Sequence, residues 1–235
     1  LVIFVGSDSH GSTRWLDIGP IQFQPSEVAK VGVIVFLAFL LEKVAKQLKD
    51  WKNLLKVFIM LLPIVGVVAY NNLSTAIIIA FLMLFVASPK YSHFLIMALV
   101  GVCMIAVFII AFPYRVSRVE AWLHPETAGD AGYQTLQGLY AIGSGGLFGK
   151  GLGESLQKMG NVPESQNDMI FTIICEELGL FGAVCVILLF MLVVWRMMVI
   201  ANNAPDLFGS LIVVGVMSHI AIQVILNIAV VTNSI

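Results

Sequence analysis

The chain has 235 residues, of which 59% are hydrophobic and 11% charged, with a mean hydropathy of +0.96 and a net charge of −1. A soluble domain carries about 25% charged residues because water must solvate its surface, so this composition excludes a soluble domain and indicates apolar surface facing lipid. The nearly neutral charge gives no basis for a nucleic-acid partner.

Apolar runs dominate the chain and define its predicted spans. A membrane-crossing helix needs about 20 mainly apolar residues to cross roughly 30 Å of hydrocarbon. Both chain ends fall in such runs, so we expect a fragment of a longer protein that is inactive by itself. The predicted fold is an all-α polytopic membrane protein, a single transmembrane domain over 1–235 whose helices form one bundle. Six segments qualify or nearly do: 28–41, 54–70, 74–87, 94–112, 169–197 and 207–235.

Lysine and arginine residues set the predicted orientation, because short cytoplasmic loops carry an excess of them. The loop after the first full span holds five lysines, and Lys90 and Arg196 fall on the same side when the spans alternate. We therefore predict that this face is cytoplasmic and that the long loop 113–167 lies outside.

The predicted outer loop 113–167 is long enough to carry a function. Loops beyond about 15 residues are usually functional or disordered, and this one contains aromatic residues. The helical spacing of Tyr133, Leu136 and Tyr140 predicts a short amphipathic or re-entrant helix at the outer interface, so the loop is expected to be partly helical.

Two charged pairs flank the early spans. Glu27 and Lys30 lie one helical turn apart at the start of the first full span, where they either pair structurally or line a polar cavity. Arg115 and Arg118, just past the fourth span, either extend to solvent or grip phosphates of a lipid-borne ligand. From the residues alone, each pair leaves both interpretations open.

Three carboxylates accompany the fifth span. Asp168 stands at its start, where capping the helix is the simplest interpretation. Glu176 and Glu177 follow about 12 Å further along the helix, inside the apolar run. Because adjacent helical positions point about 100° apart, both avoid lipid only if they face protein or a wet cavity. Carboxylates at such depth are functional candidates by default.

Other motifs do not indicate a known cofactor chemistry. The glycine run GSGGLFGKGLG at 143–153 lacks the Walker A spacing and supports either a plain turn or a backbone cradle for phosphate. The four histidines are scattered, and the three cysteines lie in apolar runs as small hydrophobic residues. We predict no metal site and no cofactor, although a divalent cation is compatible with the chemistry described next.

Four segments in order along the chain resemble the SEDS family of shape, elongation, division and sporulation proteins, and within it the FtsW/SpoVE branch. The similarity covers nearly the whole chain, whereas the family fold has ten transmembrane helices. One departure is NNLSTA at 71–76, where the family more often has Pro-Asp-Leu-Gly-Thr. The matching segments are GSTRWLDIGPIQFQPSEVAK (11–30), RVSRVEAWLHPE (115–126), GYQTLQGLYAIGSGGLFGKGLGESLQK (132–158) and PESQNDMIFTIICEELG (163–179).

The resemblance implies a peptidoglycan glycosyltransferase that polymerises lipid II on the outer face of the bacterial cytoplasmic membrane. It also implies a class B penicillin-binding transpeptidase as partner, together with other division or elongation proteins. The family's essential aspartate falls on Asp168, which would accept a proton from the attacking sugar hydroxyl. Further residues expected to bind substrate are Arg14, Glu27, Lys30, Arg115, Arg118, Gln137, Lys158 and Glu177.

Two other functions compete with the polymerase. A lipid II flippase would also need polar residues within spans, but would spread them through the membrane depth, whereas the candidates here gather on the outer side. A non-catalytic division scaffold would tolerate replacement of Asp168.

Overall fold

The computed structural model describes residues 7–9, 12–18, 21–44, 122–126, 129–160, 162 and 165–234, with scattered positions between 52 and 106. The predicted spans 54–70, 74–87 and 94–112 lie largely or wholly outside the described residues, as do Arg115 and Arg118. The described positions within 52–66 and 92–106 are helical.

The chain forms two compact units, Leu1–Val102 with Met197–His219 and Cys103–Arg196 with Ile220–Ile235. Helices α8 and α9 each contribute to both. The expectation of a single transmembrane domain stays a prediction.

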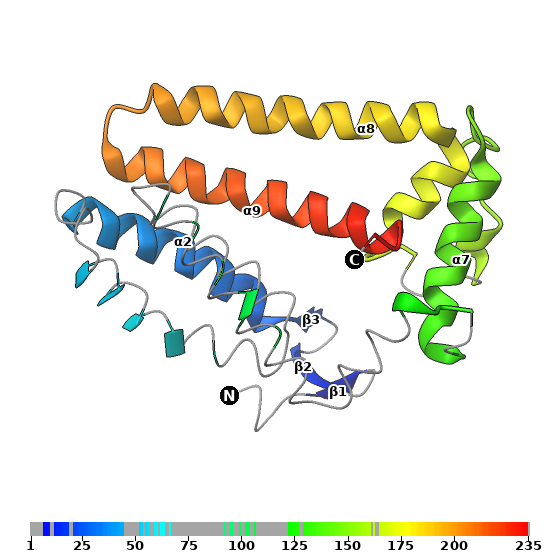
Figure 1. Ribbon diagram of the computed structural model, residues 1–235, viewed down its shortest axis with the longest axis horizontal. Coiled ribbons are helices and arrows are strands. Elements are labelled where there is room, and N and C mark those ends of the chain that lie inside the picture. The colour runs from blue at the N-terminus through cyan, green and yellow to red at the C-terminus, as the bar shows by residue number, and fades with distance from the viewer. Residues whose placement is uncertain are drawn as a thin grey trace. The chain divides into compact units, whose positions relative to one another are not determined.

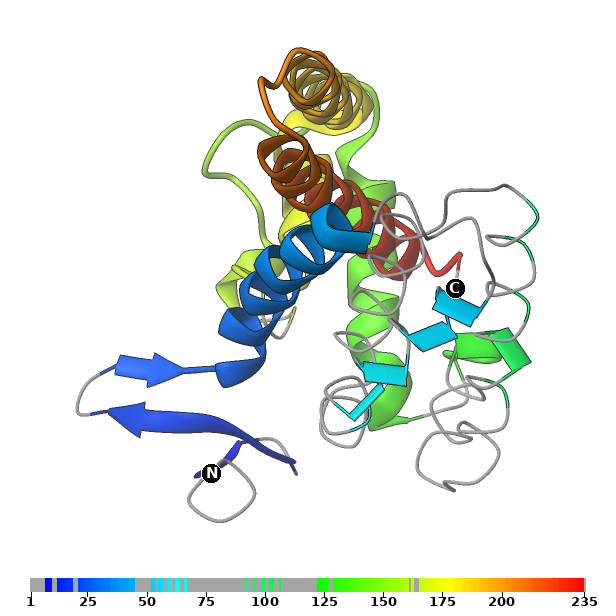
Figure 2. The same cartoon turned by 90° about the vertical axis from the view of Figure 1, so that its left-hand side faces the viewer.

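The first unit begins with a small antiparallel sheet of β1 (Ser7–Ser9), β2 (Ser12–Ile18) and β3 (Ile21–Phe23), in the order β1-β2-β3. In Figure 2, β3 leads directly into α2. No strand was predicted here, because the expected fold was all-α. The β-branched Thr13 and Ile18 and the aromatic Trp15 of β2 favour a strand, and the Gly19-Pro20 dipeptide that follows is typical of a turn.

Helix α2 (Pro25–Val44) contains the predicted span 28–41. A backbone N–H in the first helical turn has no partner within the helix, so proline, which lacks this N–H, suits that position. One face, including Val33, Leu37 and Leu41, is buried, while Val31 and Phe39 on the other face are exposed. An exposed apolar face of this kind is expected of a helix that contacts lipid.

The second unit contains α7 (Asp130–Gly145), the short 3-10 helix η2 (Gln157–Met159), most of α8 (Ile170–Asn202) and the end of α9 (Leu207–Val231). The helix predicted around Tyr133–Tyr140 is present as α7. Small residues let α7 approach the start of α8 closely (Figure 1). A Cβ at Gly145 would collide with the carbonyl of Cys175, and Ala141 is fully buried.

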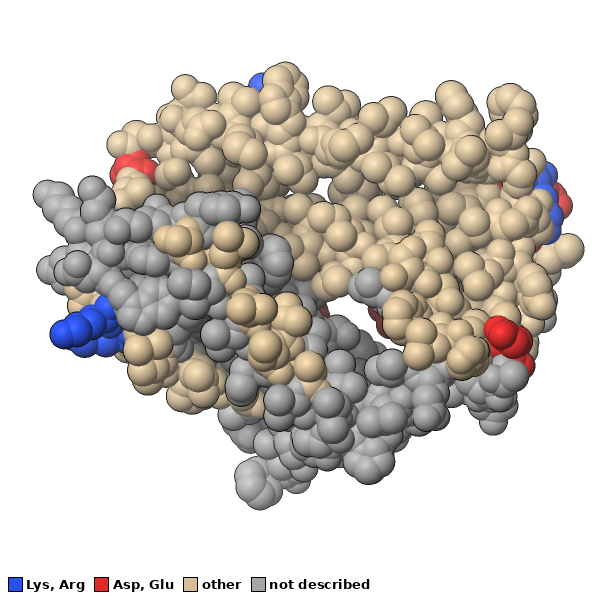
Figure 3. Space-filling view, viewed as in Figure 1, with Lys and Arg blue, Asp and Glu red and all other residues tan. Residues whose placement is uncertain are grey.

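Helices α8 and α9 are the two described helices whose length and composition suffice to cross a membrane. They correspond to the predicted spans 169–197 and 207–235. Figure 3 shows that the visible face of these helices is almost free of charged side chains. Since most of their apolar side chains are not covered by protein, the fold is that of a helical membrane protein.

Candidate functional site

Helix α8 is broken at Gly179, whose φ of 68° and ψ of −169° are non-helical. Such a break removes backbone hydrogen bonds on both of its sides. The glycine loop 146–151 replaces them. Lys150 and Gly151 donate N–H groups to the carbonyls of Glu176 and Glu177 at 2.9 and 3.0 Å. In return, the N–H groups of Leu180 and Phe181 donate to the carbonyls of Gly146 and Leu147 at 2.9 and 3.1 Å.

Two glycines make this close approach possible. A Cβ on Gly179 would collide with the backbone of Gly149 and Leu147, and a Cβ on Gly149 would collide with the carbonyl of Glu177. The glycine run is therefore a tight backbone contact. The N–H groups of Gly149, Lys150 and Gly151 all bind protein carbonyls, which argues against the phosphate cradle considered from the sequence.

Glu176 lies at the centre of a buried polar network. Its side chain is fully buried and accepts a hydrogen bond from Lys150 Nζ at 2.6 Å. The other carboxylate oxygen accepts from Ser155 Oγ and from the backbone N–H of Gln157, and Ser144 Oγ lies 3.4 Å from the first. Several donors around one buried carboxylate offset the cost of removing its charge from water. Glu176 thus faces protein, one of the two environments predicted for it.

Glu177 makes a second ion pair beside the first. Its Oε1 lies 2.6 Å from Lys158 Nζ, and the Lys158 side chain is one-third exposed. The ion pairs of these two adjacent glutamates therefore anchor Lys150 and Lys158, the first and last residues of the segment 150–158. The Lys158–Glu177 pair brings together two residues that were predicted to bind substrate.

Asp168 occupies an exposed turn immediately before α8. Its neighbours fix its backbone. The Asn227 side chain donates to the Asp168 carbonyl at 2.8 Å, and Met169 is buried in the core, where its carbonyl accepts from Thr172 Oγ1. Within the described part of the chain, no hydrogen bond or ion pair engages the Asp168 carboxylate. Asp168 thus presents an exposed carboxylate from an anchored backbone position, and within the described residues its side chain does not cap α8.

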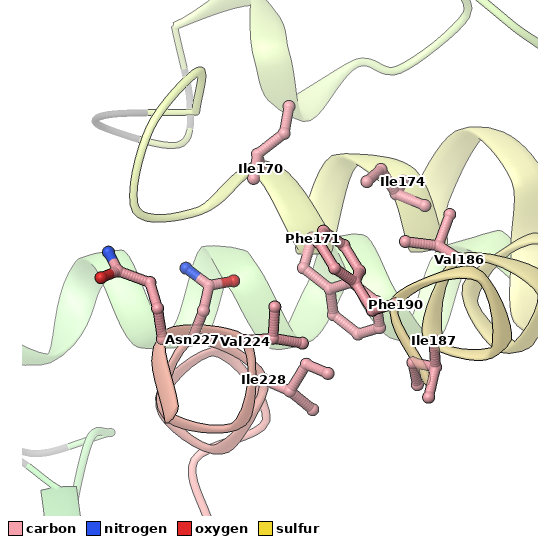
Figure 4. Close-up of a pocket in the computed structure, with 10 residues that line it drawn as sticks. Ile170, Phe171, Ile174, Val186, Ile187, Phe190, Val224, Asn227 and Ile228 are labelled. Atoms are coloured by element: carbon pink, nitrogen blue, oxygen red, sulfur yellow. The ribbon is translucent and has the colours of Figure 1, made fainter. Parts of the chain in front are cut away.

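An apolar groove of about 230 Å³ starts beside this turn. Ile170 and Phe171 from α8 line it, with Asn227 and Gln223 adding amides from α9 (Figure 4). Asn227 therefore contacts both the groove and the backbone of Asp168.

In the first unit, Glu27 and Lys30 form the pair that their spacing predicted. Their charged atoms lie 2.7 Å apart, with Lys30 almost fully buried and Glu27 half exposed. His219 of α9 lies close enough to interact electrostatically with both, and its buried Nδ1 makes no hydrogen bond to any residue that the structure describes. The structure thus supports structural pairing and also shows an unsatisfied polar atom nearby.

Two further predicted residues lie on other elements. Gln137 is half buried on α7, and Arg14 belongs to β2. Among the described residues, no three His, Cys, Asp or Glu side chains come together as metal ligands.

Sequence reasoning missed several members of the site: Lys150 and Ser155 as partners of Glu176, and Asn227 as the anchor of Asp168. The sequence carries a signal only for Asn227, a polar residue inside an apolar run, where a hydrogen-bonding role is expected.

Together these features define a helical membrane protein with an ionic loop–helix site at the end of a membrane-crossing helix. The family model of the FtsW, RodA and SpoVE cell cycle proteins matches residues 1–235. The chain belongs to this family, which confirms the resemblance to SEDS proteins.

Similar proteins carry related descriptions. Stage V sporulation protein E of Bacillus subtilis is 39% identical, and the match covers 100% of this chain and 66% of that protein. A probable peptidoglycan glycosyltransferase FtsW of Geobacter sp. is 35% identical over 99% of this chain and 66% of that protein.

Two solved structures share the fold. A structure concerned with "structural coordination of polymerization and crosslinking by a peptidoglycan synthase complex" matches with a TM-score of 0.75 at 26% identity, over 98% of this chain and 66% of that one. RodA of Thermus thermophilus matches with a TM-score of 0.62 at 27% identity, over 97% and 60%. The chain spans slightly less than two thirds of the length of these relatives.

Proposed function

We propose that the protein containing this chain is a peptidoglycan glycosyltransferase that polymerises lipid II, with Asp168 as its general base. The observation that carries this proposal is the exposed Asp168 carboxylate, which has no partner among the described residues although its backbone is fixed by Asn227. Relatives named as probable peptidoglycan glycosyltransferases support the reaction class.

In the proposed reaction, a sugar hydroxyl of one substrate attacks the anomeric carbon of another. The Asp168 carboxylate accepts the hydroxyl proton as the new glycosidic bond forms, and the bond from the anomeric carbon to the pyrophosphate oxygen breaks. A carboxylate carried on an anchored backbone suits this role because general base catalysis depends on position before basicity. An Asp168 engaged in a cap or ion pair would lack this freedom.

The leaving pyrophosphate needs positive charge nearby. We assign this role to Lys158, which is one-third exposed although paired with Glu177, and to Arg115, Arg118 and Arg14. Glu177 would then orient Lys158, and Gln137 would contact the sugars. The reaction requires no cofactor, although a divalent cation on the pyrophosphate would favour its departure in the same way.

The Lys30–Glu27 pair fits a polar cavity within the membrane. A buried lysine is expensive unless it is paired, and here the carboxylate that pairs with it within the described part of the chain, that of Glu27, is half exposed. We propose that this pair lines the substrate cavity.

We further propose a polytopic bundle of about six spans in this chain, with 113–167 on the outer face. A class B penicillin-binding transpeptidase would crosslink the strands it produces. The similar structure of a complex that coordinates polymerisation and crosslinking supports such a partner.

The test is polymerisation of lipid II by the full-length protein with its transpeptidase partner, comparing native protein with Asp168→Asn at equal folded amounts. We expect glycan strands from the native protein and a loss of at least about 100-fold in the variant, the lower range for a lost general base. Glu154→Gln, which changes an exposed carboxylate of the preceding loop 113–167, should retain activity.

Equal strands from Asp168→Asn would remove Asp168 from the mechanism. No strands from any form would favour a flippase or a scaffold instead.

A further inference from the structure

We propose that the loop 146–153 is a re-entrant segment that inserts its Leu147, Phe148 and Leu152 side chains into the lipid hydrocarbon beside α8. No assigned role accounts for these side chains. Phe148 is 81% exposed and Leu152 78% exposed, an unusual exposure for large apolar residues held on a fixed backbone. This inference does not depend on the reaction proposed above.

The position of the loop along α8 indicates lipid as the occupant. After the break at Gly179, the segment from Leu180 to Asn202 measures about 34 Å at 1.5 Å per residue, enough to cross roughly 30 Å of hydrocarbon. Leu180 and Phe181, in its first turn, are 57% and 66% exposed. The loop joins α8 at this turn, because the backbone carbonyl of Leu147 accepts the N–H of Phe181.

The apolar side chains of the loop therefore continue the lipid-facing surface of a membrane-crossing helix. Leu147 and Phe148 extend that surface from Leu180 and Phe181 at the edge of the hydrocarbon. A soluble partner would have to cover the loop while leaving the adjoining helix in lipid.

Five backbone groups of the loop meet the requirement for entry into lipid. Irregular backbone is tolerated at membrane depth only where its polar groups are satisfied within the protein. Gly149, Lys150 and Gly151 donate their N–H groups to protein carbonyls, while Gly146 and Leu147 accept from α8.

The charge of the loop is also compatible with lipid. Lys150 is the one charged residue in 146–153, and its ammonium lies 2.6 Å from the buried carboxylate of Glu176. Pairing removes most of the penalty for a charge near hydrocarbon.

The experiment places an environment-sensitive fluorophore on single cysteines in the full-length protein, with its native cysteines replaced by alanine, reconstituted in phosphatidylcholine vesicles. The labelled variants are Phe148→Cys and Leu152→Cys. Leu189→Cys, on the exposed apolar face of α8, is the lipid reference, and Glu126→Cys, exposed in the preceding loop, is the aqueous reference.

We expect blue-shifted emission at Phe148→Cys and Leu152→Cys, with loss of fluorescence when lipids carry a nitroxide near the headgroup and little loss with aqueous iodide. Leu189→Cys should respond most to a deeper nitroxide, and Glu126→Cys only to iodide. Quenching of both loop positions by iodide alone would overturn the proposal. Protection from both quenchers would also overturn it, since it would mean that protein covers the loop.

Discussion

At the residue scale, the two buried charges of the described structure are stabilised very differently. Glu176 accepts hydrogen bonds from a lysine, a serine and a backbone N–H, whereas among the described residues Lys30 forms an ion pair with Glu27. A buried charge with several donors is a structural centre. The Glu176 network therefore orders the loop that carries Lys150 and Ser155.

Replacing Glu176 should destabilise the protein more than replacing its neighbour. Glu176→Leu leaves Lys150 and Ser155 without their acceptor, and we expect a loss of about 3–5 kcal/mol in the free energy of unfolding. The matched control Glu177→Leu disrupts a more exposed pair and should cost about 1 kcal/mol or less. Denaturant titration in detergent measures both.

A second variant separates charge from packing. Adding Lys150→Met to Glu176→Leu should recover part of the stability, because it removes the uncompensated lysine. Equal losses for the two glutamates, or no recovery in the double variant, would contradict a central role for Glu176.

The candidate site could be predicted only in part. The resemblance to the family singled out Asp168 as the essential aspartate, and the spacing of Glu27 and Lys30 alone indicated that they could pair. The partners of Glu176 lie 21 and 26 residues away, in a loop whose return to α8 depends on tertiary backbone contacts. No local pattern encodes such a contact, so the network was not foreseen.

At the element scale, the break in α8 depends on glycine. The dihedral angles of Gly179 belong to a region open essentially to glycine alone, and its missing Cβ admits the loop backbone. The apolar run around it reads as one continuous helix, which explains why the sequence predicted the span but not its interruption.

Gly179→Ala should therefore destabilise the protein by about 2 kcal/mol or more, from backbone strain and collision with Gly149. Gly143→Ala is the matched control, since nothing lies within 4 Å of a Cβ there, and alanine in a helix interior should add about 0.5–1 kcal/mol. Thermal unfolding in detergent compares the two. A Gly179→Ala protein as stable as Gly143→Ala would show that the break is not required.

The helices were more predictable than the sheet. Long apolar runs fixed α2, α8 and α9 to within a few residues, because lipid burial dictates both composition and length. The strands at 7–23 are short and their pairing is set by turns, so hydropathy gave no sign of them.

At the scale of the whole molecule, orientation in the membrane is the property that the proposed function most requires. The predicted topology puts 113–167 outside and the turn between α8 and α9 in the cytoplasm. Lipid II polymerised on the outer face needs Asp168 on that side.

Cysteine accessibility in whole cells tests this topology. In the full-length protein lacking native cysteines, Glu126→Cys should react with a membrane-impermeant maleimide in intact cells. Asn203→Cys, exposed after α8, should react only after permeabilisation, because lysine and arginine favour the cytoplasmic side. Reaction of both from the same side would refute the predicted arrangement.

The exchange of backbone hydrogen bonds at Gly179 ties a loop and a helix into one cooperative unit. Four hydrogen bonds join 146–151 to 176–181. Once the loop detaches, the α8 groups can pair only with each other, Leu180 with Glu176 and Phe181 with Glu177, which requires the helix to straighten at Gly179. Partial opening is therefore costly, and local fluctuations should separate the loop and straighten or fray the helix together. Mechanical strain applied along α8 would reach the loop through the same bonds, because neither part can change its conformation alone.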